Sequence, residues 1–113
     1  MQLAVVTSKT HALARRGLAR CGLNEFFSVL IGADDVREHK PHPAPVLAAL
    51  GRLSADPADA VFIGDSPHDI EAGRAAGVQT AAALWGPFPR EALAQAAPHH
   101  WLAEPTRIAA LAR

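Results

Sequence analysis

The sequence predicts an α/β fold in which helices flank a parallel sheet. Short apolar runs alternate along the chain with segments whose apolar residues recur at helical spacing, and this alternation is typical of β–α–β units. The run Val61–Ile63 is apolar throughout, as expected of a buried strand. Gly64 and Asp65 follow it at once, so this strand ends in a sharp turn that carries a carboxylate. We expect a single domain over residues 1–113, with right-handed crossovers between its strands.

The other elements follow from the same patterns. Strands are expected where short apolar runs are bounded by polar or turn residues, and helices where apolar residues share one face or a capping residue precedes them. In chain order we expect a strand at 3–6, a helix at 11–21, a turn at 24–27, a strand at 28–31, a helix at 44–53, the central strand at 61–63 with a helix to 76, a strand at 79–84, a helix at 90–95, a strand at 100–102 and a terminal helix to 113.

The expected core is apolar and rich in alanine. The residues assigned to it by helical periodicity, by the aromatic turn or by their small size are Leu13, Leu18, Leu47, Leu50, Phe26, Phe27 and Cys21. With one cysteine, the chain cannot form an internal disulfide.

Composition excludes several classes of function. The 11 basic and 11 acidic side chains balance, so nothing indicates a nucleic acid or a membrane as partner. No apolar run has the length of a membrane span, and the N-terminus lacks the charged region and cleavage site of a signal peptide. We expect a cytoplasmic protein.

Polar residues with complementary chemistry follow three of the predicted elements. Thr7 and Ser8 end the first strand, Lys40 lies in a Lys-Pro-His-Pro segment expected to be extended, and Asp65 and Asp69 follow the central strand. Because ligands of open α/β sheets bind beyond the carboxyl ends of the strands, these groups predict a site for phosphate and Mg²⁺. Simpler roles exist for some of them: Asp69 completes a capping box that begins at Ser66, and Thr7 or Ser8 would serve as a helix N-cap.

The segments VVTSK, KPHP and GDSPHD, in this order, resemble motifs two, three and four of the haloacid dehalogenase (HAD) superfamily. The connecting sequence is similar to that of phosphoglycolate phosphatases and related pyrophosphatases. The resemblance implies that Thr7 and the Ser8 backbone N–H bind the phosphoryl group. It also implies that Lys40 pairs with phosphate and with the nucleophile, that Asp65 is a direct Mg²⁺ ligand, and that Asp69 supports the metal shell.

One motif of the family is missing from this sequence. In the superfamily an Asp-x-Asp-x-Thr segment upstream supplies the nucleophile that forms an aspartyl-phosphate, and no such segment occurs here. Asp34 and Asp35 do not replace it, because they lie in a polar turn. The chain therefore resembles the C-terminal part of such an enzyme, without the N-terminal strand and the cap.

The family's nucleophile strand lies between the strand that ends at Thr7 and the strand that ends at Gly64. Without it we expect one of three outcomes: a complementary N-terminal segment, direct pairing of the two flanking strands, or a homodimer.

The resemblance implies Mg²⁺-dependent hydrolysis of a small phosphorylated substrate, with little or no activity from this chain alone. The alternative is a non-catalytic, truncated module that binds phosphate, Mg²⁺ or a partner. A phospho-receiver domain is disfavoured, because receivers place the acid pair before the Thr and Lys.

Overall fold

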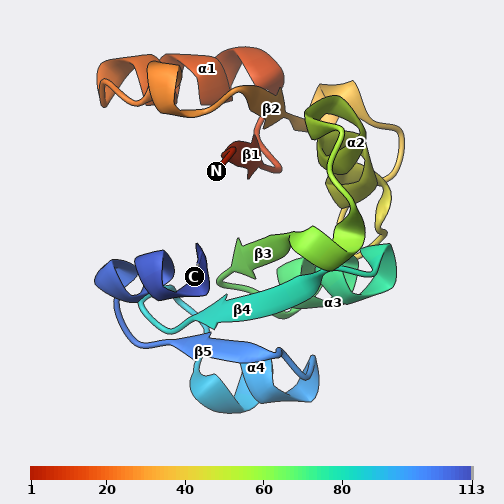
Figure 1. Cartoon of the computed structure of the whole chain (residues 1–113), viewed down its shortest axis with the longest axis vertical. Coiled ribbons are helices and arrows are strands. Elements are labelled where there is room, and N and C mark those ends of the chain that lie inside the picture. Colours follow the sequence, from red (N-terminus) through yellow and green to blue (C-terminus); the bar gives the residue numbers. More distant parts are fainter. Residues whose placement is uncertain (113) are drawn as a thin grey trace.

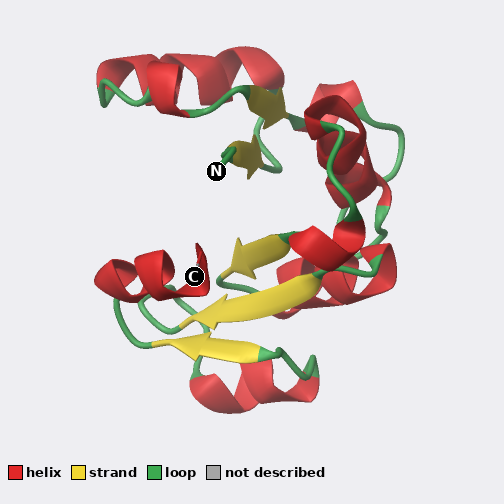
Figure 2. Ribbon diagram, in the orientation of Figure 1, coloured by secondary structure: helices red, strands yellow, loops and turns green. Residues whose placement is uncertain are grey.

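The computed structural model describes residues 1–112 and has the alternating β/α order expected from the sequence (Figures 1 and 2). Its strands are β1 (Ala4–Val6), β2 (Val29–Ile31), β3 (Val61–Gly64), β4 (Gln79–Ala83) and β5 (His100–Leu102). Its α-helices are α1 (His11–Arg20), α2 (Ala44–Leu53), α3 (Pro67–Ala76) and α4 (Arg90–Gln95). Short 3₁₀ segments cover Asn24–Phe26, Ala33–Asp35 and Pro57–Asp59, and a longer one, Pro105–Ala112, stands where the terminal helix is expected.

The strands form two separate parallel sheets. In the first sheet β1 pairs with β2, with Val5 opposite Leu30. In the second sheet β3 pairs with β4, with Ile63 opposite Ala81, and β4 pairs with β5. Within residues 1–112, β1 and β3 each have a partner on one side only. Of the three alternatives stated for these strands, direct pairing of β1 with β3 is therefore not the one observed.

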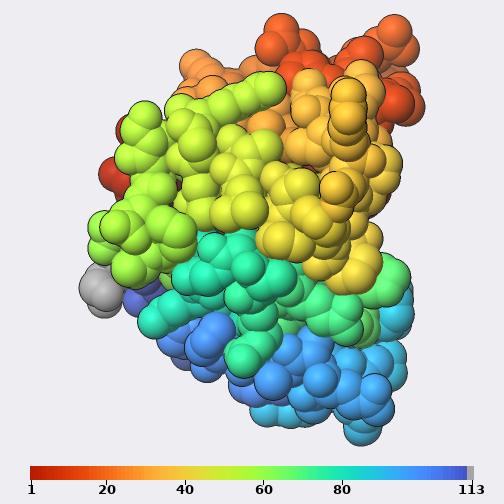
Figure 3. Space-filling view, turned by 90° about the vertical axis from the view of Figure 1, so that its right-hand side faces the viewer, coloured from red at the N-terminus to blue at the C-terminus, as the bar shows by residue number. Residues whose placement is uncertain are grey.

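Helix α2 packs against both sheet regions and connects them. Its Ala49 packs in a cluster with Ile31 of the first sheet. Its Val46 and Leu50 pack in a second cluster with Ala72 of α3, the helix that lies against β3 and β4. Figure 1 shows α2 at the side of the molecule, and Figure 3 shows the yellow and yellow-green residues of this side between the orange residues above and the teal residues below.

Several residues expected in the core are exposed. Leu13 is 55% exposed, Leu47 46% and Phe26 57%, and Cys21 is also exposed, whereas Leu50 is buried as expected. Helix α1 lies on the outside of the small first sheet and buries a single alanine, because no other layer within residues 1–112 covers its remaining faces (Figure 1). Periodicity identifies the apolar positions of a helix correctly, but it does not tell whether a partner layer is present.

Within residues 1–112, no helix is both long enough and apolar enough to cross a membrane.

Candidate active site

The site is built where β3 ends and α3 begins. Ser66 is the N-cap of α3, and its Oγ accepts a hydrogen bond from the Asp69 N–H at 3.2 Å. Pro67 occupies the first turn of the helix, where its missing N–H costs nothing. The helix start predicted from Ser-Pro-His-Asp is therefore confirmed.

The Asp69 carboxylate does not complete the capping box that the sequence predicts, because it bonds the Asp65 N–H and Lys40 and not the Ser66 N–H. Its Oδ2 accepts a hydrogen bond from the Asp65 N–H at 3.2 Å, and its Oδ1 forms an ion pair with Lys40 Nζ at 2.7 Å. The residue is only 9% exposed. A buried carboxylate needs such partners, because burial of an unpaired charge is costly. Asp69 thus ties Lys40 and the Asp65 backbone together at the carboxyl end of β3.

Two glycines leave the space that the carboxylates occupy. A Cβ atom at Gly64 would lie 2.2 Å from Asp69 Cβ and 2.7 Å from its Oδ2. A Cβ atom at Gly86, in the loop after β4, would lie 2.5 Å from Asp65 Cβ and 2.7 Å from Asp65 Oδ2. The sequence analysis did not predict a role for Gly86. Its position just beyond the carboxyl end of the strand next to β3 could have indicated that it lies close to Asp65.

Lys40 lies in a turn and not in the extended segment that the prolines predict. The His42 N–H donates to the His39 carbonyl at 2.9 Å across the turn, and the peptide bond between Lys40 and Pro41 is cis. Besides its pair with Asp69, the ammonium group lies 5.9 Å from the centre of the Phe62 ring. The Lys40 side chain is only 13% exposed, so the lysine is fixed and not a mobile surface group.

Thr7 and Ser8 lie at the carboxyl end of β1, in the other sheet. The Thr7 N–H donates to the Ile31 carbonyl at 2.9 Å, and Thr7 Oγ1 accepts from the Lys9 N–H at 3.2 Å. Neither residue is the N-cap of α1, which is Thr10, so that simpler role is not observed. Among residues 1–112, no hydrogen bond or ion pair joins Thr7 or Ser8 to the cluster of Lys40, Asp65 and Asp69.

Asp34 and Asp35 are structural residues near α1. Asp34 Oδ1 accepts from the His11 N–H at 2.7 Å, and Asp35 Oδ2 accepts from the Gly32 N–H at 2.7 Å and contacts His11 Nδ1 at the same distance. The Gly32 hydrogen bond, followed by the His11 contact, lowers the pKa of Asp35 below its usual value. Both aspartates lie in the 3₁₀ segment after β2, next to the start of α1, where the sequence predicts a polar turn.

The donor set for a divalent cation is incomplete in this part of the chain. Residues 1–112 contain no group of three or more His, Cys, Asp or Glu side chains arranged to hold a metal ion. Asp65 is exposed and has a carboxylate suited to a hard cation. Asp69 uses both of its oxygens on Lys40 and on the Asp65 N–H. One exposed carboxylate suits a Mg²⁺ ion only if the ion keeps several of its waters.

The sequence model of the haloacid dehalogenase-like hydrolases matches residues 1–83. The chain belongs to this family. It is 41% identical over 110 residues to the pyrophosphatase PpaX of Bacillus pumilus, a match that covers 97% of this chain and 51% of the relative. It is 46% identical over 82 residues to a phosphoglycolate phosphatase of Xylella fastidiosa, covering 73% of this chain and 36% of the relative.

A solved structure with the same fold is that of a protein described as a predicted phosphoglycolate phosphatase from Haemophilus somnus. The two superpose with a TM-score of 0.90 at 30% identity, over 99% of this chain and 50% of that one. This HAD-family hydrolase chain therefore spans about half the length of the relatives it matches. The expected family and the α/β fold are confirmed, and the relatives are named as phosphatases and pyrophosphatases.

Proposed function

We propose that this chain carries the phosphate-binding and metal-binding part of a Mg²⁺-dependent phosphomonoester hydrolase similar to phosphoglycolate phosphatases. The observation that supports it best is the cluster of Lys40, Asp65 and Asp69 at the carboxyl end of β3, in a chain of the HAD-like family. A fixed ammonium group beside an exposed carboxylate suits a phosphoryl group that is bound together with a cation.

Each residue has a distinct task in this proposal. Lys40 uses one of its three N–H donors on Asp69, which leaves two for a phosphoryl oxygen and the attacking carboxylate. Thr7 and the Ser8 N–H bind the phosphoryl group from the end of β1. Asp65 binds Mg²⁺, which when bound neutralises charge on the phosphate. Asp69 positions both Lys40 and Asp65.

The nucleophile would come from a segment that is not in this sequence. An aspartate of that segment attacks phosphorus, an O–P bond forms, and the ester oxygen leaves with a proton from the second aspartate; water then hydrolyses the aspartyl-phosphate. We place this segment as a strand between β1 and β3, whose facing edges have no partner within residues 1–112.

Two unpaired strand edges also favour self-association. We therefore expect this chain to bind a complementary N-terminal segment or, without it, to form a homodimer. Light scattering over a range of protein concentrations tests this expectation. A well-folded monomer at low concentration that stays monomeric on addition of the complementary segment would contradict both arrangements.

The activity assay measures hydrolysis of an aryl phosphate with Mg²⁺ by the 113-residue chain and by its Asp65→Asn variant. We expect no turnover from either, together with a folded circular dichroism spectrum. Turnover that Asp65→Asn abolishes would show that the chain itself supplies a nucleophile, and the assignment of roles would be wrong.

A non-catalytic module is the second candidate, favoured by the absence of an Asp-x-Asp-x-Thr sequence in the chain. Such a module would bind phosphate or Mg²⁺ without turnover, even when a nucleophile segment is supplied. The small phosphorylated substrate and the cytoplasmic location remain predictions.

A further inference from the structure

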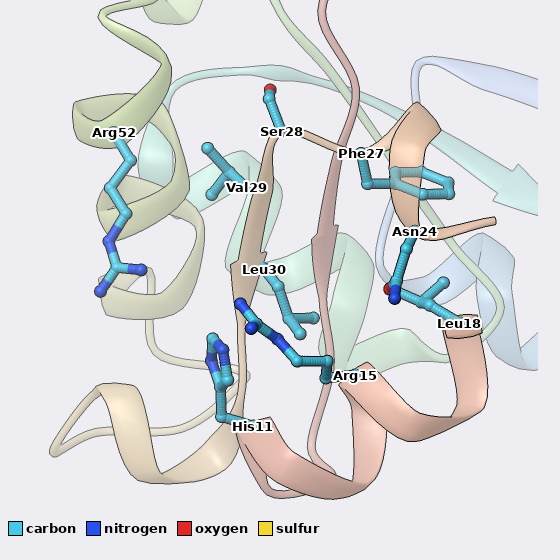
Figure 4. A pocket seen from close by; sticks show the side chains of 9 residues that line it. All are labelled: His11, Arg15, Leu18, Asn24, Phe27, Ser28, Val29, Leu30 and Arg52. Carbon is cyan, nitrogen blue, oxygen red and sulfur yellow. The ribbon is translucent and has the colours of Figure 1, made fainter.

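A cavity of about 360 Å³ lies at β2 and is lined by α1, α2 and the segment between α1 and β2 (Figure 4). This volume falls in the usual range for small-molecule sites, roughly 300–1,000 Å³. None of the residues of the candidate active site lines it. Within residues 1–112, β2 pairs only with β1, so the cavity adjoins a strand with an open edge.

The cavity collects basic side chains from two helices. Arg15 belongs to α1 and Arg52 to α2; in Figure 4 Arg15 reaches toward β2, and Arg52 extends along the side of α2. Neither guanidinium forms an ion pair within the part of the chain that the structure describes. Guanidinium groups usually pair with carboxylates or phosphates. Here Arg52 interacts with Asp35 at a distance, without a direct ion pair, and Arg15 forms no ion pair within residues 1–112.

Acidic groups near the cavity are already engaged. Asp35 is bound by the Gly32 N–H and by His11, and Asp34 accepts from the His11 N–H. Neither aspartate lines the cavity. The charged side chains that line the cavity are therefore the two arginines.

The neutral lining favours a phosphate over a carboxylate. Ser28 and Asn24 add a hydroxyl and an amide to the two guanidinium forks. A carboxylate offers two oxygens in one plane, whereas a phosphate group offers three or four oxygens that point in several directions and can accept from donors on both sides. Leu18 and Phe27 add an apolar wall that suits a carbon substituent on the phosphate.

We propose that this cavity binds the phosphate group of a small phosphate ester between Arg15 and Arg52, at a site separate from the candidate active site. The proposal does not depend on the proposed function, because it uses neither Asp65 nor Lys40.

Amide chemical shifts of the 113-residue chain, recorded without Mg²⁺, test the proposal residue by residue. The probes are inorganic phosphate and phenylphosphonate, a phosphate-ester analogue that is not hydrolysed, at constant ionic strength. Shifts at Val29 and Leu30 report the cavity, and shifts at Lys40 and Asp65 report the candidate active site. The two sites are thus followed separately in one spectrum, so failure of one is distinguished from failure of the other.

We expect both probes to shift the signals of Val29 and Leu30, with phenylphosphonate binding more tightly because of the apolar wall. Arg15→Gln and Arg52→Gln should each weaken binding at the cavity about tenfold, since each removes a charged hydrogen-bond donor. Arg16→Gln is the matched control: it removes the same charge from the exposed neighbouring position of α1, and should leave the affinity unchanged.

Three results would overturn the proposal. The first is no saturable shift at Val29 and Leu30 in a folded chain. The second is equal weakening by Arg15→Gln and Arg16→Gln, which would indicate an effect of net charge. The third is tighter binding of inorganic phosphate than of phenylphosphonate, which would exclude an ester as the ligand.

Discussion

Lys40 and Asp69 form an ion pair of 2.7 Å in which both side chains are largely buried, 13% and 12% exposed. The same carboxylate accepts the Asp65 N–H, so the backbone of Asp65 is connected to the Lys40 ammonium group through one residue. This connection holds a cation and a candidate metal ligand at the end of β3 before any substrate binds.

Removal of Lys40 should destabilise the chain. In Lys40→Met the buried Asp69 carboxylate keeps only its hydrogen bond to Asp65, and we expect the free energy of unfolding to fall by about 2–4 kcal/mol. Urea unfolding followed by circular dichroism measures it. Lys9→Met, at an exposed lysine, is the control and should change this free energy by less than about 0.5 kcal/mol.

The double variant Lys40→Met/Asp69→Asn separates the energy of the ion pair from the contribution of each side chain's other contacts. It should lose less stability than the sum of the two single variants, because neither charge is left alone. Strictly additive losses would show that the two side chains do not interact in solution.

Gly64→Ala should destabilise the chain by about 1–3 kcal/mol, because the new Cβ would lie 2.2 Å from Asp69 Cβ. Gly51→Ala is the opposite control. A Cβ at Gly51 meets nothing within 4 Å, and alanine in a helix should add about 0.5–1 kcal/mol. Thermal unfolding of the two variants compares them, and equal effects would mean that Asp69 does not lie over Gly64.

Asp35 should stabilise the folded chain at neutral pH, and this stabilisation should be lost at acidic pH. Its pKa in the folded chain lies below the ordinary 3.8, so the contribution is present above that value and is lost as the pH falls through the lower folded pKa. The difference in unfolding free energy between the wild type and Asp35→Asn should be steady near pH 5 and shrink below about pH 4.

The matched control for this titration is Asp59→Asn, at an exposed aspartate outside the hydrogen-bonded cluster of Asp35 and His11. The difference in unfolding free energy between the wild type and Asp59→Asn should not shrink between about pH 5 and pH 4 in this way. If the difference in unfolding free energy between the wild type and Asp35→Asn grows as the pH falls, the pKa of Asp35 is raised and not lowered by folding, which contradicts the prediction.

Local signals in the sequence predicted the elements well. Ser66, followed by Pro67 and by Asp69, marked the start of α3, because capping depends on neighbours in the chain. The direct contact between Lys40 and Asp69 did not follow from spacing, since it joins a turn to the first turn of α3; the sequence predicted only that both residues belong to one site.

Long-range features were the ones that sequence patterns missed. Leu13 lies on an apolar stripe but is 55% exposed, because nothing within residues 1–112 covers that face of α1. The turn at Lys40 was expected to be extended, and the strands β1 and β3 were allowed to pair directly but do not. Each of these depends on which segments meet in space, and periodicity carries no such information.

The most direct test of the central claim restores the missing strand. The segment of the Bacillus pumilus pyrophosphatase PpaX that this chain does not cover is fused before Met1, and Mg²⁺-dependent hydrolysis of an aryl phosphate is measured. We expect turnover that Asp65→Asn and Lys40→Met each reduce at least about a hundredfold, while Arg16→Gln leaves it unchanged. A folded fusion without turnover, or one whose turnover survives Asp65→Asn, would contradict the assignment of this site.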